Sequence, residues 1–173
     1  MRLFWDMDGT LAVWQTGVPL SMVMQRGYFE NLPEQTNVVL AAGMLIRSGV
    51  SSFVNSAYFS EADFYKEEKE IWIKKRLPLP ASHMYFVPCG QSKATAVGTV
   101  SKDDFLVDDR TLNLLDWEIA GGTGIKIITE INDTHRTWSG ARIYAADAPR
   151  KIASDITAII RKEGYCDGRY SIC

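Results

Sequence analysis

Apolar and polar positions form alternating blocks along the 173 residues, and these blocks predict strands and helices in turn. Short apolar runs bounded by turn-forming residues predict buried strands at 3–5, 50–55, 84–87, 104–107 and 125–129, with a short edge strand at 142–145. Segments whose apolar residues lie three or four apart predict helices at 34–48, 61–76, 111–119 and 149–163, and a shorter one that ends at Val97. Strands that alternate with helices predict an α/β fold, in which helices cover both faces of a mostly parallel sheet.

Residues 13–33 interrupt this alternation. A strand and the helix after it are usually joined by about two to six residues, whereas this connection is about 20 residues long. Glycine and proline recur in the segment, and only two short helices are predicted in it, at 21–25 and 28–32. We therefore expect one domain spanning residues 1–173, with residues 13–33 as a small cap insertion that acts as a lid.

Composition narrows the class of protein. Of the residues, 46% are apolar and 23% are charged, as in ordinary soluble domains, and no apolar run reaches the roughly 18 residues of a membrane span. The net charge of −2 offers no positive field to a nucleic acid. A strand that begins at residue 3 leaves no space for a signal peptide, and three widely spaced cysteines suit reduced thiols. We expect a cytoplasmic protein with no membrane partner and no stable nucleic-acid partner, and a homodimer is compatible with the sequence.

Two aspartates follow the first predicted strand, in the run Asp6-Met7-Asp8-Gly9-Thr10. Side chains two apart on a strand point the same way, so Asp6 and Asp8 can face one site. Carboxylates that lie this close repel each other unless a cation sits between them, and a hard divalent ion such as Mg²⁺ suits oxygen ligands. Gly9 permits a sharp exit turn, and Thr10 offers a hydroxyl and backbone N–H groups to an anion.

Polar residues also follow two other predicted strands. Ser56 lies just after the strand at 50–55, and Asp108 and Asp109 directly follow the strand at 104–107. Ligands of parallel sheets collect at the carboxyl ends of the strands, where all these residues are expected. Adjacent carboxylates at the end of a buried strand need a counter-charge. Lys93 lies at the start of a short helix, after the predicted strand at 84–87.

Together, Asp6-x-Asp8-Gly9-Thr10, Ser56, Lys93 and Asp108-Asp109 resemble, in order and in placement, the four motifs of the haloacid dehalogenase superfamily of phosphohydrolases. The resemblance implies a Rossmann-like three-layer sandwich with a central five-stranded, mostly parallel sheet and a small helical cap. It also implies hydrolysis of a phosphate ester through an aspartyl-phosphate intermediate, with Mg²⁺ as the cofactor.

The same resemblance assigns roles to individual residues. Asp6 would be the nucleophile, and Asp8 the general acid and then the general base. The groups that bind the phosphoryl oxygens would be Thr10, Ser56, Ala57 and Lys93. The metal ligands would be Asp6, the backbone carbonyl of Asp8 and Asp109, with Asp108 supporting them, or with Asp108 and Asp109 in the reverse order.

Further runs are similar to the 5'(3')-deoxyribonucleotidase branch of this superfamily, namely those at 28–32, 56–58, 90–94, 106–110 and 121–125. The branch implies hydrolysis of nucleoside 5'-monophosphates, with deoxyribonucleotides preferred and an aromatic slot for the base. The candidates for that slot are Trp14, Tyr28, Phe29 and Tyr58, because aromatic faces stack on bases.

Two other functions stay open. The first keeps the chemistry but acts on another small phosphate ester or on a nucleic-acid end, although an isoelectric point of about 5.7 disfavours a polynucleotide. The second is a catalytically silent Mg²⁺-binding domain that serves as an interaction module.

Overall fold

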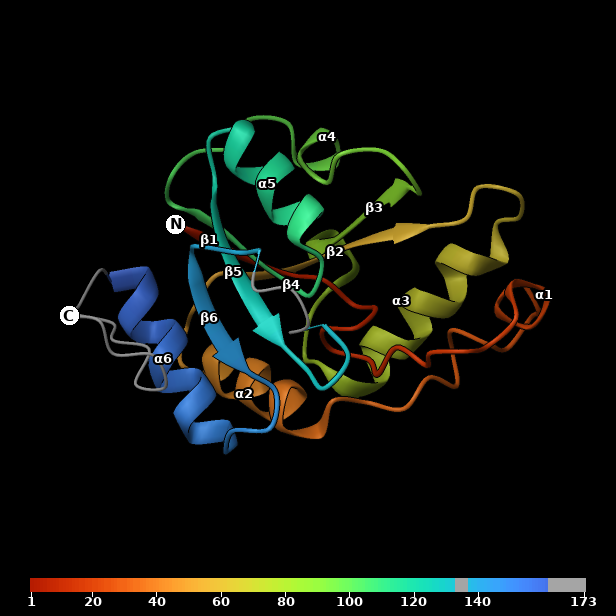
Figure 1. Cartoon of the computed structure of the whole chain (residues 1–173), viewed down its shortest axis with the longest axis horizontal. Coiled ribbons are helices and arrows are strands. Elements are labelled where there is room, and N and C mark those ends of the chain that lie inside the picture. The colour runs from red at the N-terminus through yellow and green to blue at the C-terminus, as the bar shows by residue number, and fades with distance from the viewer. Residues whose placement is uncertain (133–136, 162–173) are drawn as a thin grey trace.

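The computed structural model of the protein describes residues 1–132 and 137–161, and its strands form one six-stranded parallel sheet in the order β3-β2-β1-β4-β5-β6 (Figure 1). The strands are β1 (Arg2–Trp5), β2 (Ser52–Tyr58), β3 (Met84–Pro88), β4 (Asp104–Asp108), β5 (Thr123–Ile128) and β6 (Ala141–Tyr144). The α/β prediction is confirmed. The sheet has six strands rather than five because the edge segment pairs with β5 over four residues.

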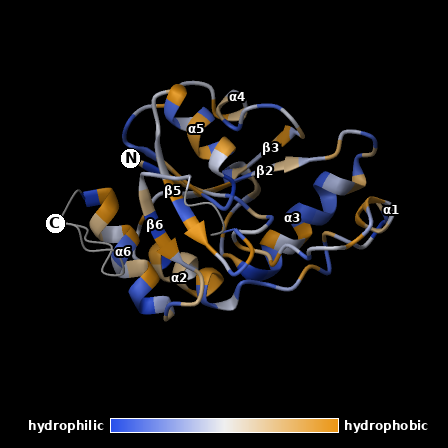
Figure 2. Cartoon of the chain, viewed as in Figure 1, coloured by the Kyte–Doolittle hydropathy of each residue, from blue (hydrophilic) through white to orange (hydrophobic). Residues whose placement is uncertain are grey.

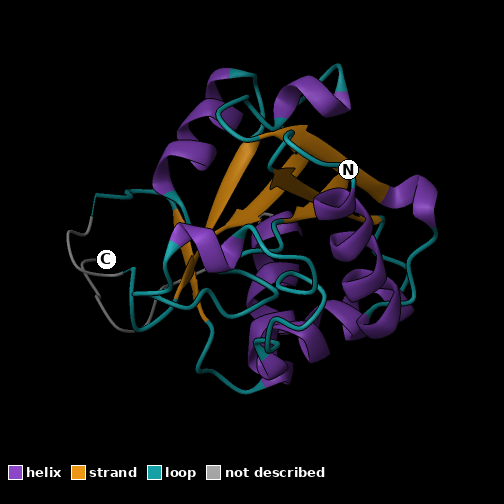
Figure 3. Ribbon diagram, turned by 90° about the vertical axis from the view of Figure 1, so that its right-hand side faces the viewer, coloured by secondary structure: helices purple, strands orange, loops and turns teal. Residues whose placement is uncertain are grey.

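Helices cover both faces of this sheet, so that the molecule has three layers (Figure 3). They are α1 (Leu20–Val23), α2 (Thr36–Arg47), α3 (Phe64–Arg76), α4 (Ala94–Val97), α5 (Thr111–Ile119) and α6 (Pro149–Arg161), with a 3₁₀ turn η1 (Ala81–His83). Alternate residues of β1 pack into two cores, since Leu3 and Trp5 meet the layer of α2, α3 and α6 while Phe4 meets that of α4 and α5. In Figure 2 much of α2 is coloured hydrophobic, whereas β5 and β6 mix hydrophobic and hydrophilic residues.

Most predicted boundaries shift by one to three residues, and the differences near the β2 end and α3 bear on the site. The strand predicted at 50–55 continues to Tyr58, because its second half pairs with β3, and Ser56 therefore lies inside the strand. The helix predicted from residue 61 begins at Phe64. Residues 28–31 form turns rather than a helix, and the backbone N–H groups of Gly27 and Phe29 donate to the carboxylate of Glu68. The predicted end of the last helix, 162–163, lies outside the described residues.

The insertion at 13–33 is bonded to α3 along much of its length. The Tyr65 hydroxyl donates to the carbonyl of Met24 at 3.0 Å, and the Trp72 indole donates to the carbonyl of Leu32 at 2.8 Å. Glu68 adds the two bonds already described. These bonds fix the insertion as a wall beside the carboxyl ends of β1 and β2. In the described part of the chain, no helix has the length and apolar character that crossing a membrane requires.

Candidate active site

A tight loop follows β1 and depends on Gly9. Asp6 still belongs to the sheet ladder, since its N–H donates to the carbonyl of Val107 at 2.9 Å, and the chain then turns back so that the N–H of Ala12 meets the carbonyl of Met7 at 2.8 Å. Gly9 has a φ of 82°, and a Cβ placed there would lie 2.4 Å from Oδ2 of Asp109. Both the positive φ and this close approach require glycine.

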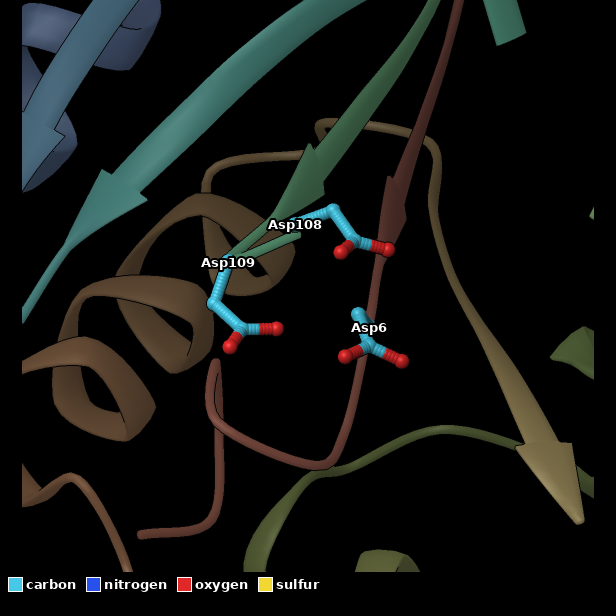
Figure 4. A group of neighbouring side chains, drawn as sticks. All are labelled: Asp6, Asp108 and Asp109. Carbon is cyan, nitrogen blue, oxygen red and sulfur yellow. The ribbon is translucent and has the colours of Figure 1, made fainter. Parts of the chain in front are cut away.

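Three carboxylates from the ends of β1 and β4 converge beside this loop (Figure 4). Oxygen atoms of Asp6, Asp108 and Asp109 all lie within 4.8 Å of one another. Burial raises the pKa of Asp6 to about 7, although nearby Lys93 opposes the shift. Burial and the charge of Asp108 raise the pKa of Asp109 well above its usual range. A cluster with such pKa values favours a bound cation.

Lys93 supplies one positive charge to the cluster. Its Nζ donates to Oδ1 of Asp6 at 2.5 Å and to Oδ2 of Asp108 at 2.5 Å, and the residue is 4% exposed. Burial alone would lower the pKa of Lys93, but the carboxylates of Asp108 and Asp6 outweigh it and raise that pKa. Lys93 follows β3, and its backbone is held by Asn55, whose buried side-chain amide donates to the carbonyl of Lys93 at 2.9 Å.

Asp108 and Asp109 differ in how their oxygens are used. Both oxygens of Asp108 accept bonds from the protein, from Lys93, from the side-chain amide of Asn113 and from the N–H of Arg110. In contrast, Oδ1 of Asp109 is buried and has no hydrogen-bond partner among the described residues. Asp109 therefore has ligand capacity left for a metal ion, and Asp108 orients the lysine.

The sequence analysis missed a second buried lysine, Lys69 on α3. Its Nζ donates to Oδ2 of Asp8 and, at 3.1 Å, to Oγ of Ser56, and it lies 4.5 Å from the centroid of the Phe29 ring. A signal for it was available. The core-facing positions of α3 recur at helical spacing, and two of them hold charged residues; these positions are Tyr65, Glu68, Lys69, Trp72 and Ile73.

These groups surround a cavity of about 440 Å³. Eight of the residues singled out from the sequence line it, namely Asp6, Asp8, Trp14, Ala57, Tyr58, Phe29, Lys93 and Asp109. The lining also includes five residues that were not singled out, namely Phe59, Lys69, Cys89, Arg110 and Asn113. The cavity thus combines a charged floor with aromatic walls.

Four of the predicted site residues do not line this cavity. Thr10 is fully buried, and its hydroxyl has no partner within the described ranges. Tyr28 packs edge-on against Phe29, with ring centroids 5.2 Å apart. Ser56 and Asp108 do not line the cavity. Each instead accepts a hydrogen bond from a lysine that does, Ser56 from Lys69 and Asp108 from Lys93.

A wider cavity of about 880 Å³ opens beyond Trp14, at the carboxyl ends of β5 and β6. The described residues that line it include Glu34 and Glu130 but no lysine or arginine. An anionic ligand therefore finds its counter-charges in the smaller cavity.

No protein-family model matches this sequence, and no curated protein is found to be a relative. Solved structures are similar in fold. The crystal structure of D,D-heptose 1,7-bisphosphate phosphatase from Burkholderia thailandensis covers 91% of this chain and 98% of its own, with a TM-score of 0.61 and 14% identity. A HAD-superfamily hydrolase from Ehrlichia chaffeensis covers 93% of this chain and 96% of its own, with a TM-score of 0.53 and 12% identity. The chain therefore has the Rossmann-like fold of these two hydrolases.

Proposed function

We propose that this protein is a Mg²⁺-dependent phosphomonoesterase that forms an aspartyl-phosphate on Asp6. The observation that carries the proposal is the cavity floor, where the Asp6 carboxylate accepts from Lys93 and lies near Asp109, whose Oδ1 has no hydrogen-bond partner among the described residues. A nucleophile, a counter-charge and a place for a metal ion are the groups that phosphoryl transfer requires.

The donor set fits Mg²⁺. Asp6 and Asp109 are buried carboxylates whose pKa values are raised by burial, and Lys93 neutralises only part of the charge of the cluster. These two carboxylates, with the backbone carbonyl of Asp8, would hold the ion. When bound, Mg²⁺ supplies positive charge that offsets and orients the phosphoryl oxygens.

The proposed reaction has two displacements at phosphorus. In the first, an Asp6 oxygen bonds to phosphorus and the ester P–O bond breaks, while Asp8 gives its proton to the leaving oxygen. In the second, Asp8 takes a proton from water, the water oxygen bonds to phosphorus, and the bond from phosphorus to Asp6 breaks. Lys93 pairs with the free Asp6 carboxylate before the first displacement and after the second.

For the substrate we propose a nucleoside 5'-monophosphate, with the deoxy form preferred. The volume of about 440 Å³ suits a small ligand. The walls offer aromatic faces on which a base can stack, from Trp14, Phe29, Tyr58 and the additional Phe59. The preference for the deoxy sugar rests on the resemblance of the sequence to the deoxyribonucleotidases.

Phosphate release from a panel of ribonucleoside and deoxyribonucleoside monophosphates tests this proposal, with Mg²⁺ and then with EDTA. We expect Mg²⁺-dependent release that favours deoxynucleotides and is abolished in Asp6→Asn. The matched control is Asp116→Asn, which removes the same charge from an exposed position on α5. Release from p-nitrophenyl phosphate but from no nucleotide would refute the proposed substrate class. If no ester released phosphate, the proposed phosphatase activity would be refuted, and a Mg²⁺-binding interaction module would be favoured.

A further inference from the structure

Helix α3 carries two charged residues into the core. Glu68 is 3% exposed and Lys69 is 1% exposed, and they lie one turn from the buried Tyr65 and Trp72. A buried ammonium group is unfavourable unless it is paired and hydrogen-bonded. Lys69 therefore occupies this position because of what its Nζ contacts.

Those contacts are two groups of the proposed reaction. The ammonium of Lys69 donates to Oδ2 of Asp8 and to the hydroxyl of Ser56. The other oxygen of Asp8, Oδ1, is buried and has no hydrogen-bond partner in the part of the chain that the structure describes. Lys93 instead pairs with Asp6 and Asp108. The two lysines thus serve different carboxylates, and the described contact that orients the Asp8 carboxyl is the one to Lys69.

The same turn of α3 also holds the wall of the cavity. Glu68 accepts the N–H of Gly27 at 2.6 Å and that of Phe29 at 3.1 Å, and the Lys69 ammonium lies over the Phe29 ring. Glu68 and Lys69, adjacent on α3, therefore hold the aromatic wall at Phe29 and the Asp8 carboxyl in a fixed relative position. Such support keeps reacting groups in a productive geometry.

We propose that Lys69 is a positioning residue that aims the Asp8 carboxyl at the leaving-group oxygen. Its charge also stabilises the carboxylate that forms as the proton leaves Asp8. This inference rests on the proposed phosphatase function and adds a residue outside the motifs that suggested it.

The test exploits the leaving group. An alkoxide such as the sugar oxygen of a nucleotide needs a proton in the transition state, whereas p-nitrophenolate leaves without one. For Lys69→Met we expect kcat/KM to fall about 100-fold on a deoxynucleotide and less than tenfold on p-nitrophenyl phosphate, because general acid catalysis contributes about 10²–10⁴-fold. A series of aryl phosphates should then show a steeper dependence of rate on leaving-group pKa than in the unmodified protein.

The ratio of the two rates in one preparation does not depend on the fraction of protein that is folded, so a partly unfolded variant still gives an answer. Lys74→Met is the matched control, because Lys74 lies on the same helix, has a side chain that is 50% exposed, and should leave the ratio unchanged. Lys69→Arg, which keeps the charge, should recover part of the ratio.

An equal loss on both substrates would overturn the inference, since it would mean that Lys69 binds the phosphoryl group or only supports the fold. Unchanged rates in Lys69→Met would overturn it too. These failures differ from failure of the proposed function, in which the unmodified protein would release no phosphate from any ester.

Discussion

If Mg²⁺ binds at the aspartate cluster as proposed, its removal is expected to destabilise the protein more at high pH than at low pH. In the absence of a cation, burial raises the pKa of Asp6 to about 7 from its ordinary value of 3.8. The folded state then holds a proton on Asp6 that the unfolded state has already lost, so stability falls as the pH rises through this range. A shift of about three pH units corresponds to at most about 4 kcal/mol at neutral pH.

Mg²⁺ should reverse this loss, because it binds the deprotonated carboxylates and its affinity therefore rises over the same pH range. At a concentration about 100-fold above its dissociation constant, the ion adds about 2.7 kcal/mol to the free energy of unfolding. For a chain of this size, that corresponds to a rise in Tm of about 5–10 °C.

Thermal unfolding followed by circular dichroism, in EDTA and in Mg²⁺, provides the assay at about pH 5.5 and about pH 8. We expect a larger Mg²⁺-induced rise in Tm at the higher pH, and its loss in Asp109→Asn. The exposed control Asp116→Asn should keep the full response. If Asp109→Asn responded to Mg²⁺ as strongly as the unmodified protein, or if the response did not change with pH, the reasoning would be refuted.

Three further substitutions test the supporting structure. Gly9→Ala forces a Cβ to within 2.4 Å of Oδ2 of Asp109 at a φ of 82°, so calorimetry should show at least about tenfold weaker Mg²⁺ binding, and unchanged binding would contradict the close approach. Glu68→Ala leaves two backbone N–H groups without their acceptor, and urea unfolding should show a loss of about 2–4 kcal/mol rather than less than 1. Hydrogen bonding to Arg2 lowers the pKa of Asp104 to about 2, so its stabilisation is complete above about pH 4 and is lost as the pH falls towards 2. Asp104→Asn should therefore lower stability by about 1–2 kcal/mol at neutral pH and flatten the acid limb of the unfolding curve, and an unaltered limb would argue against the pair.

Local pattern was sufficient to predict the strands, most helices and the α/β class. Leu3, Phe4 and Trp5 form a short apolar run that is buried as part of β1. The polar residues Asp6 and Asp108 mark where β1 and β4 end. The prediction failed in the short insertion, whose contacts are made with a distant helix. A short helix was predicted at 28–32, but the segment forms turns whose start is bonded to Glu68 on the distant helix α3.

The candidate site divides in the same way. Asp6 and Asp109 could be singled out because each follows a strand of one sheet, and parallel strands bring their carboxyl ends to one edge. Lys93 was singled out by the resemblance, and it pairs with Asp6. Tyr28 and Phe29 could not be distinguished, since neighbouring residues in a turn point in different directions and only Phe29 lines the cavity. Thr10 was predicted to bind a phosphoryl oxygen, and its side chain is buried in the loop and does not line the cavity.

The sequence by itself therefore determined the architecture, the charged strand ends and the chemistry that they favour, because these depend on periodicity and on residues close together in the chain. Only the tertiary structure decided that Oδ1 of Asp109 has no partner within the described ranges, which aromatic rings line the cavity, and that Lys69 meets Asp8 across 61 positions of sequence. The physical reason is that helix packing sets such contacts, and a helix can present a buried lysine to any of several partners until its neighbours are in place.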